Sequence, residues 1–304
     1  MDSNVVMKKK NHLAGGLGES PALWVTPLSV CLILIFIYPL IEIIRLSLTD
    51  TKIGGEGYSY TLATIKSLFT DPGFYFMLRT TLFFVFFSVV FQLLNGFVVA
   101  LSVDTGEKLH MRGTVFVRTV VLISMVIPGV IIGIIWKMMY DESPGGLLNY
   151  YLQILGFSHI SFLTDPSIAI VSATVANIWR GTGQSMILLY AGLKTIPKEL
   201  TEAAMVDGAN GFNRLIKIII PSISPVALIT IILNTIGTFN TFDMIMSLTG
   251  GGPGRSTEVF ALSAYNQIFQ LLDLGRGSAI AVLLLLINSV MAAGYFYLLR
   301  KGEK

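Results

Sequence analysis

The segment KELTEAAMVDGAN, from Lys198 to Asn210, is a charged stretch set between two long apolar segments. Pro197, just before it, suits the first turn of a helix because its missing N–H would have no partner there. Glu199 and Glu202 then favour the positive end of the helix dipole. Gly208 is typical of the residue that ends a helix. The segment therefore predicts a short helix of the kind found in water-soluble proteins.

The rest of the chain has the composition of a membrane protein. Of its 304 residues, 53% are hydrophobic and only 13% are charged, whereas soluble domains carry about 25% charged residues. Six segments are long and apolar enough to cross a bilayer, which takes roughly 20 residues. These are Leu23–Ile44, Met77–Val103, Thr114–Met138, Ser167–Leu189, Ser222–Leu248 and Ser278–Leu299. We therefore expect an all-α integral membrane fold with six transmembrane helices and no soluble catalytic domain.

Positive charge sets the expected orientation, because cytoplasmic loops collect Lys and Arg. With the N-terminus inside, 13 of the 21 Lys and Arg residues fall on the cytoplasmic side. Both termini of this multi-pass protein of the cell membrane are then cytoplasmic, and the first apolar run is a retained span because it is too long for a typical signal peptide. The expected parts are a cytoplasmic segment (1–22), a first span with an external loop (23–76), a core of five spans (77–300) and a tail (301–304).

The charged helix has a small-residue face. Ala203 and Ala204 lie on one side with Gly208 and Ala209 just beyond, while Glu202 lies on the polar side. One interpretation is an interfacial helix that lies on lipid without a protein partner. Lipid-binding faces more often carry Phe, Trp or Leu, so the small residues favour a partner protein that approaches the backbone closely.

The order of residues here resembles a known family. Glu202-Ala203-Ala204, then Gly208, Ile218 and Pro221, resembles the EAA loop of membrane subunits from binding-protein-dependent ABC importers. The only departure is Ile220, where the family usually has leucine. The resemblance implies a type I ABC importer permease fold in which residues 191–221 form a cytoplasmic loop with a coupling helix that docks on a separate ATPase. The residues that it assigns to ATPase coupling are Glu202, Ala203, Ala204, Asp207, Gly208 and Ala209.

A second stretch narrows the resemblance. FNTFDMIMSLTGGGPGRSTE, from Phe239 to Glu258, is similar to the end of the fifth span in sugar-importing members of the maltose and glycerol-phosphate type. The implied partners are a second homologous permease, two ATP-binding subunits, an extracytoplasmic solute-binding protein, a sugar or oligosaccharide and membrane lipid, with no nucleic acid. The resemblance also implies that this chain binds no cofactor, because the partner ATPase binds Mg-ATP.

The glycine run in this stretch raises a rival interpretation as a phosphate-binding loop. That pattern fails because Thr249 stands where the first glycine is required and Arg255 where lysine is required. An external turn fits better, either purely structural or in contact with the solute-binding protein through Gly251, Gly252 and Pro253.

Polar side chains inside two spans indicate a path for the solute, because such groups are costly in lipid and usually face a cavity or another helix. Those of the fourth span recur every three to four residues on one face. The expected pathway residues are Asn177, Arg180, Gly181, Gln184, Asn240, Thr241 and Asp243. By resemblance, the fourth-span residues and Asn240 align with sugar contacts of maltose-type permeases. Hydrogen bonding between helices is the alternative for each amide, and for Ser185 and Asn234 it is favoured.

Arg180 departs from the maltose-type pattern, which has an apolar residue there. An unpaired guanidinium at membrane depth is costly, so Arg180 needs an anion. Asp243 is one candidate. The other is an acidic substrate, such as a uronate-bearing oligosaccharide or a phosphorylated polyol.

Two other classes of function fit less well. A secondary carrier driven by an ion gradient would use intramembrane carboxylates, and only Asp243 and Glu42 are available in or near spans. A membrane enzyme would need a convergent acid, base or metal site, and the three histidines are scattered in loops. Trp136 and Tyr140, near the outer end of the third span, are expected to be interfacial aromatics.

Overall fold

The computed structural model describes residues 21–302, except residues 56 and 144. Most of the expected cytoplasmic segment (1–22) and the end of the expected tail (301–304) therefore lie outside the described residues. In chain order the helices are α1 (Pro21–Leu32), α2 (Tyr38–Ser47), α3 (Ala63–Thr70), α4 (Pro72–Lys108), α5 (Thr114–Val126), α6 (Gly129–Met139), α7 (Leu147–Ile154), α8 (Pro166–Lys194), α9 (Lys198–Val206), α10 (Gly211–Arg214), α11 (Ile220–Phe239), α12 (Asp243–Leu248), α13 (Phe260–Tyr265) and α14 (Leu274–Gly302). The helices are accompanied by wider π-helical turns. Of these, η2 (Ile33–Ile37) joins α1 to α2, η3 (Leu215–Ile219) joins α10 to α11, and η4 (Asn266–Gln270) follows α13.

Four helical stretches of the described chain are long and apolar enough to cross a membrane. They are Trp24–Ser47, Pro72–Lys108, Gly211–Phe239 and Leu274–Tyr297. The bent pair α5–α6 makes a fifth if it counts as one span. α8 has a spanning length of 29 residues, but its polar side chains lower its hydropathy. The six-span count stays a prediction that depends on α8.

The expected third span is not one straight helix. α5 ends at Val126, α6 begins at Gly129, and their axes differ by 106°. Pro128 between them causes the break, because proline disfavours helical backbone at the residue before it, and Ile127 is extended with ψ 129°. The expected fifth span is also too long, since α11 ends at Phe239 and α12 starts separately at Asp243.

Asp-Pro pairs begin the two central helices. Asp71 Oδ1 accepts a hydrogen bond from the amide of Gly73 at 2.8 Å, and Pro72 is the first residue of α4. Asp165 caps α8 in the same way, with Pro166 as its first residue. An acidic cap satisfies free N–H groups and a proline at the first position loses no hydrogen bond.

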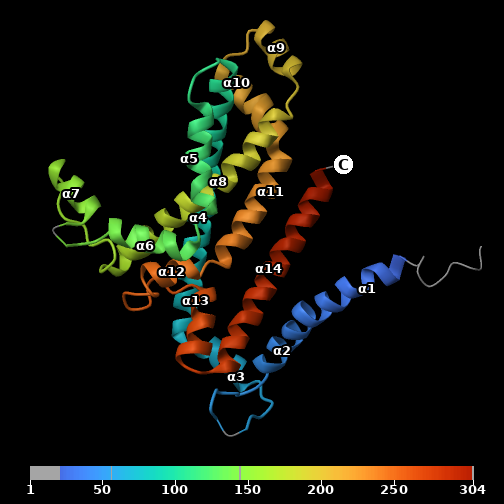
Figure 1. Cartoon of the computed structure of the whole chain (residues 1–304), viewed down its shortest axis with the longest axis vertical. Helices are drawn as coiled ribbons and strands as arrows, with labels where there is room; N and C mark the ends of the chain where they lie inside the picture. The colour runs from blue at the N-terminus through green and yellow to red at the C-terminus, as the bar shows by residue number, and fades with distance from the viewer. Residues whose placement is uncertain (1–20, 56, 144, 303–304) are drawn as a thin grey trace, which may run out of the picture.

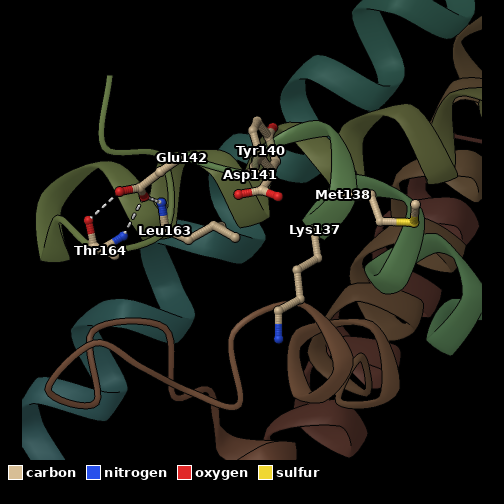
Figure 2. A pocket seen from close by; sticks show the side chains of 7 residues that line it. All are labelled: Lys137, Met138, Tyr140, Asp141, Glu142, Leu163 and Thr164. Carbon is tan, nitrogen blue, oxygen red and sulfur yellow. Dashed lines mark hydrogen bonds between the residues drawn. The ribbon is translucent and has the colours of Figure 1, made fainter. Parts of the chain in front are cut away.

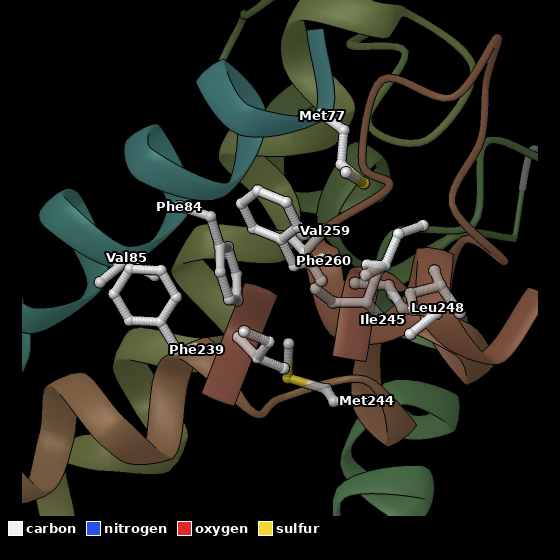
Figure 3. Packing of buried hydrophobic residues seen from close by; sticks show 14 of the residues in the cluster. Met77, Phe84, Val85, Phe239, Met244, Ile245, Leu248, Val259 and Phe260 are labelled. Atoms are coloured by element: carbon white, nitrogen blue, oxygen red, sulfur yellow. The ribbon is translucent and has the colours of Figure 1, made fainter. Parts of the chain in front are cut away.

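The helices α4 and α8 cross in close contact at the centre of the molecule. A side chain on Gly96 would place its Cβ 2.3 Å from Cβ of Ser185, so the glycine permits this close approach. Towards α3, buried side chains of α4, α12 and α13 make the main core, including Phe84, Met244 and Phe260 (Figure 3). The pair α1–α2 extends away from this core, and α2 packs on α14 (Figure 1).

Candidate functional site

The short charged helix forms where the sequence predicts it. α9 runs from Lys198 to Val206 after Pro197, and the chain turns at Gly208, whose φ is +76°. Left-handed backbone of this kind is readily adopted only by glycine. Asn210 then caps the next helix by accepting the amide of Asn213 at 2.8 Å. These local signals make α9 a separate unit beyond one end of the long helices (Figure 1).

α9 offers a free surface in this chain. None of its nine residues is buried. Of the six residues expected to contact an ATPase, four are exposed and two, Ala204 and Ala209, are half-buried. Val206 is 88% exposed although it is apolar. Apolar exposure beside small residues is typical of a protein contact surface.

A second feature is a polar cavity of about 140 Å³ between the central helices. Its walls come from α4, α5, α8 and α11, with Thr241 just after α11. The lining residues are Gln92, Met125, Asn177, Arg180, Gly181, Gln184, Leu233, Asn234, Gly237, Thr238 and Thr241. Five of the seven expected pathway residues therefore meet at this cavity. Their role in binding stays a prediction.

Hydrogen bonds between helices hold the cavity walls. Gln92 Nε2 donates to the carbonyl oxygen of Asn177 at 2.9 Å, and Asn177 Nδ2 donates to Thr238 Oγ1 at 3.4 Å. Asn234 Nδ2 donates to Ser185 Oγ at 2.7 Å, as the packing interpretation of these two residues predicts. Asn177 thus ties α4, α8 and α11 together.

Sequence reasoning missed Gln92. It is the one buried amide side chain of α4, whose middle also contains the buried Ser88 and the exposed Asn95. A Cβ on Gly181 would lie within 2.7 Å of the amide atoms of Gln92, so the glycine makes room for them. Because an amide is costly in lipid, Gln92 could have been identified from the sequence as a residue that faces a cavity or another helix.

Arg180 and Asp243 lie close together. Arg180 Nη1 is 3.6 Å from Asp243 Oδ1, and each side chain is 31% exposed. Arg180 lines the cavity and Asp243 does not. The Asp243 carboxylate lies over Gly129, at the break between α5 and α6, where an added Cβ would come within 2.1 Å of Oδ2. The distance is that of an ion pair without a close hydrogen bond.

Asn240 does not line the polar cavity, although the next residue, Thr241, does. Because α11 ends at Phe239, Asn240 is the residue that follows the helix, and its Nδ2 donates to the carbonyl of Ile236 at 2.8 Å. Its Oδ1 lies 3.5 Å from Nδ2 of Asn288 on α14. Asn240 is exposed and does not line the polar cavity.

The glycine-rich turn is held from within. The hydroxyl groups of Thr249 and Thr257 are 2.7 Å apart, and Thr257 also donates to the carbonyl of Gly252 at 2.9 Å. Gly251 is buried, while Gly252 and Pro253 are half-buried. A contact with another protein at this turn would therefore involve Gly252 and Pro253 more than Gly251.

A further pocket of about 450 Å³ lies beside the loop after α6 (Figure 2). Its lining is Lys137, Met138, Tyr140, Asp141, Glu142, Leu163 and Thr164. Glu142 accepts hydrogen bonds from the amides of Leu163 and Thr164 and from the Thr164 hydroxyl. Burial by itself would raise the pKa of Glu142, but these bonds outweigh it and hold the pKa below its usual value.

The expected interfacial role of Tyr140 is wrong. Its side chain is 3% exposed, and its hydroxyl donates to the carbonyl of Ser172 at 3.1 Å. Trp136 packs on both Tyr140 and Trp179. Tyr140 therefore lies in the interior, whereas Trp136 is half-buried and Trp179 is 40% exposed.

The described residues contain no group of three or more His, Cys, Asp or Glu side chains placed to hold a metal ion. The absence of a cofactor in this chain stays an expectation.

A helical membrane protein with a polar cavity and a projecting charged helix has the features of a transport permease. The chain belongs to the family described as binding-protein-dependent transport system inner membrane component, which matches residues 96–302. It is 36% identical to the trehalose/maltose transport system permease protein MalF of Thermococcus litoralis, over 93% of each chain. It is 31% identical to the sn-glycerol-3-phosphate transport system permease protein UgpA of Rhizobium meliloti, over 92% of this chain and 94% of that one.

The fold has a solved counterpart. A chain of a bacterial ABC transporter involved in the import of the acidic polysaccharide alginate superposes with a TM-score of 0.79 at 20% identity. The match covers 92% of this chain and 94% of that one. The type I ABC permease fold is thereby shown for this chain, and its family is one of transport components.

Proposed function

We propose that this chain is a membrane-spanning subunit of an ATP-driven importer of a sugar or oligosaccharide, which an extracytoplasmic solute-binding protein delivers. The observation that carries the proposal is the exposed face of α9, which stands beyond the end of the helices that enclose the polar cavity. The names of the relatives support the class of solute, since both carry sugars or a polyol phosphate.

The proposed complex has a second homologous permease and two ATP-binding subunits. Mg-ATP binds to those subunits, and this chain contributes the pathway and the coupling. Closure of the ATPase pair on ATP draws the docked α9 helices together and favours the outward-open arrangement of the spans. Hydrolysis separates the ATPases and restores the inward-open arrangement.

The proposed orientation places α9 and both termini in the cytoplasm. The positive charge near α9 supports it, since Lys194, Lys198, Arg214 and Lys217 flank this helix. The loop before α3 and the glycine-rich turn then face outward, where Gly252 and Pro253 can meet the solute-binding protein.

The polar cavity is the proposed point of solute passage. Amide groups such as those of Asn177 and Gln184 pair well with sugar hydroxyls, because each offers both donors and an acceptor. Arg180 has two uses that the proposal keeps open: a structural pair with Asp243, or attraction of an acidic sugar. Asn240 lies outside the cavity in this conformation and is proposed to meet the solute only at the rim.

Co-purification tests the proposed function. Expressed together with the genes that neighbour its own, the chain should bring down an ATPase, and Gly208→Arg should abolish this association or uncouple ATP hydrolysis from uptake. Gly57→Arg is a matched control, because Gly57 also has a positive φ (+79°) and, like Gly208, has nothing within 4 Å of an added Cβ. Normal uptake by Gly208→Arg without any ATPase would refute the proposal and favour an ion-gradient carrier.

A further inference from the structure

A cluster of charged side chains joins three helices at the end of the molecule where α9 lies. Lys194 Nζ on α8 is 2.7 Å from Asp104 Oδ1 and 2.9 Å from Glu107 Oε2, both on α4. The Tyr190 hydroxyl donates to Glu107 Oε2 at 2.6 Å. Arg118 Nη1 on α5 lies 3.5 Å from Glu107 Oε1 and donates to the Tyr190 hydroxyl at 3.3 Å. We call these five residues the inner clamp.

Asp104 is the buried member of the inner clamp, whereas the side chains of Lys194, Arg118 and Glu107 are 42%, 30% and 27% exposed. The Asp104 side chain is only 4% exposed, and it also binds Lys108 Nζ at 2.7 Å. Exposed ion pairs contribute little, whereas a buried carboxylate that loses a partner is left uncompensated. Buried ion pairs add little net stability compared with apolar packing. The role that best explains the inner clamp is therefore to fix the positions of α4, α5 and α8 relative to one another.

The inner clamp and α9 line a common cavity. A cavity of about 760 Å³ has Asp104, Glu107 and Lys194 in its lining together with Thr201 and Glu202 of α9. Only residues 195–197 separate the end of α8 from the start of α9. Residues 195–197 therefore connect α9 to the end of α8 that carries Lys194, just as residues 207–210 connect it to α10 and α11.

The same three helices, together with α11, form the walls of the polar cavity. From Lys194 to Arg180 is about 21 Å along α8 at 1.5 Å per residue. Within this stretch α4 and α8 touch at Gly96 and Ser185, and just beyond it the Gln92 side chain donates to the carbonyl oxygen of Asn177. α5 reaches the cavity through Met125.

From these contacts we propose that the inner clamp makes α4, α5 and α8 move as one body with α9, so that ATP hydrolysis is converted into movement at the polar cavity. Its members are positioning residues, and they touch neither solute nor nucleotide. The proposal rests on the proposed function, because it assumes an ATPase docked on α9.

Lys194→Met tests the inner clamp in the complete importer, reconstituted in liposomes with its solute-binding protein. We expect the ATPase to stay bound and to hydrolyse ATP, while solute imported per ATP falls by about tenfold, the size of an ordinary coupling between distant sites. Lys194→Arg keeps the charge and should restore the ratio. Arg112→Met is a control, because Arg112 is an exposed cation between α4 and α5 that forms no ion pair among the described residues.

Tyr190→Phe provides a second test if Lys194→Met does not fold, since it removes only one hydroxyl. It should lower the same ratio in the same direction. An importer with a lower melting temperature but an unchanged ratio of solute to ATP in both variants would overturn the proposal. Failure of the wild-type chain to bind any ATPase would instead refute the proposed function.

Discussion

The ion pair between Arg180 and Asp243 allows a quantitative test of what Arg180 does. The pair is changed by Arg180→Gln, by Asp243→Asn and by both together, which removes charge but keeps hydrogen-bonding capacity. A charge reversal is a poorer choice, because the Asp243 carboxylate lies close to Gly129 and a basic side chain is longer than that of aspartate.

The expected coupling follows from the geometry. At 3.6 Å, two unit charges attract by about 5 kcal/mol at an effective dielectric constant near 20 and by about 1 kcal/mol in bulk water. Each side chain is 31% exposed, so solvent screens part of this attraction. A structural pair should therefore show a coupling free energy of about 1–3 kcal/mol.

The assay is a double-mutant cycle on the free energy of unfolding, measured by denaturant titration of the purified protein in detergent. Each single variant should be less stable than the wild type, and the double variant should recover part of the loss. Import of neutral and acidic sugars is measured on the same four proteins.

A coupling below about 0.5 kcal/mol would refute the structural pair. If Arg180→Gln then lost import of an acidic sugar and kept that of a neutral one, the substrate would be the anion that Arg180 serves.

Two further predictions concern packing and pH. Gly96→Ala should destabilise the protein by about 1–3 kcal/mol, because the new methyl group overlaps Ser185. Gly294→Ala is the control and should be neutral or slightly stabilising, because nothing lies within 4 Å of the added Cβ. Equal melting temperatures for the two variants would contradict the close contact of α4 and α8. The lowered pKa of Glu142 means that its hydrogen bonds stabilise the fold above the unfolded pKa of about 4.3 and lose this effect as pH falls through the lower folded pKa. The melting difference between wild type and Glu142→Gln should therefore be constant above about pH 5 and shrink below pH ~4, and a difference that stays constant down to pH ~3 would be inconsistent with it.

The sequence predicts the helices better than the path of the chain between them. Apolar runs and end signals are local, so α4, α8 and α9 form where the sequence predicts helices, although α4 runs five residues further at each end than the expected span 77–103 and α8 ends five residues after the expected Leu189. The sequence analysis did not predict the bend between α5 and α6, because both halves are apolar, although Pro128 marks the position of the break. α11 was extended too far because Thr241 to Leu248 is also apolar enough to continue a span.

The candidate site was predictable where one helix carries it. The three- to four-residue spacing of Asn177, Arg180 and Gln184 places them on one face, and the structure confirms that they line one cavity. Residues from other helices depend on tertiary contacts that spacing does not encode. The inner clamp, whose Asp104 and Lys194 are 90 residues apart, was missed for this reason.

The composition of α8 limits how the importer can open. The side chains that make α8 too polar for an ordinary span, Asn177, Arg180 and Gln184, are the ones that face the cavity among α4, α5 and α11. Separating α8 from α4 would expose them and the buried Gln92 amide to lipid, at several kcal/mol for each unsatisfied group. Alternating access is therefore expected to move this group of helices as a unit against another surface, and the proposed second permease would supply that surface.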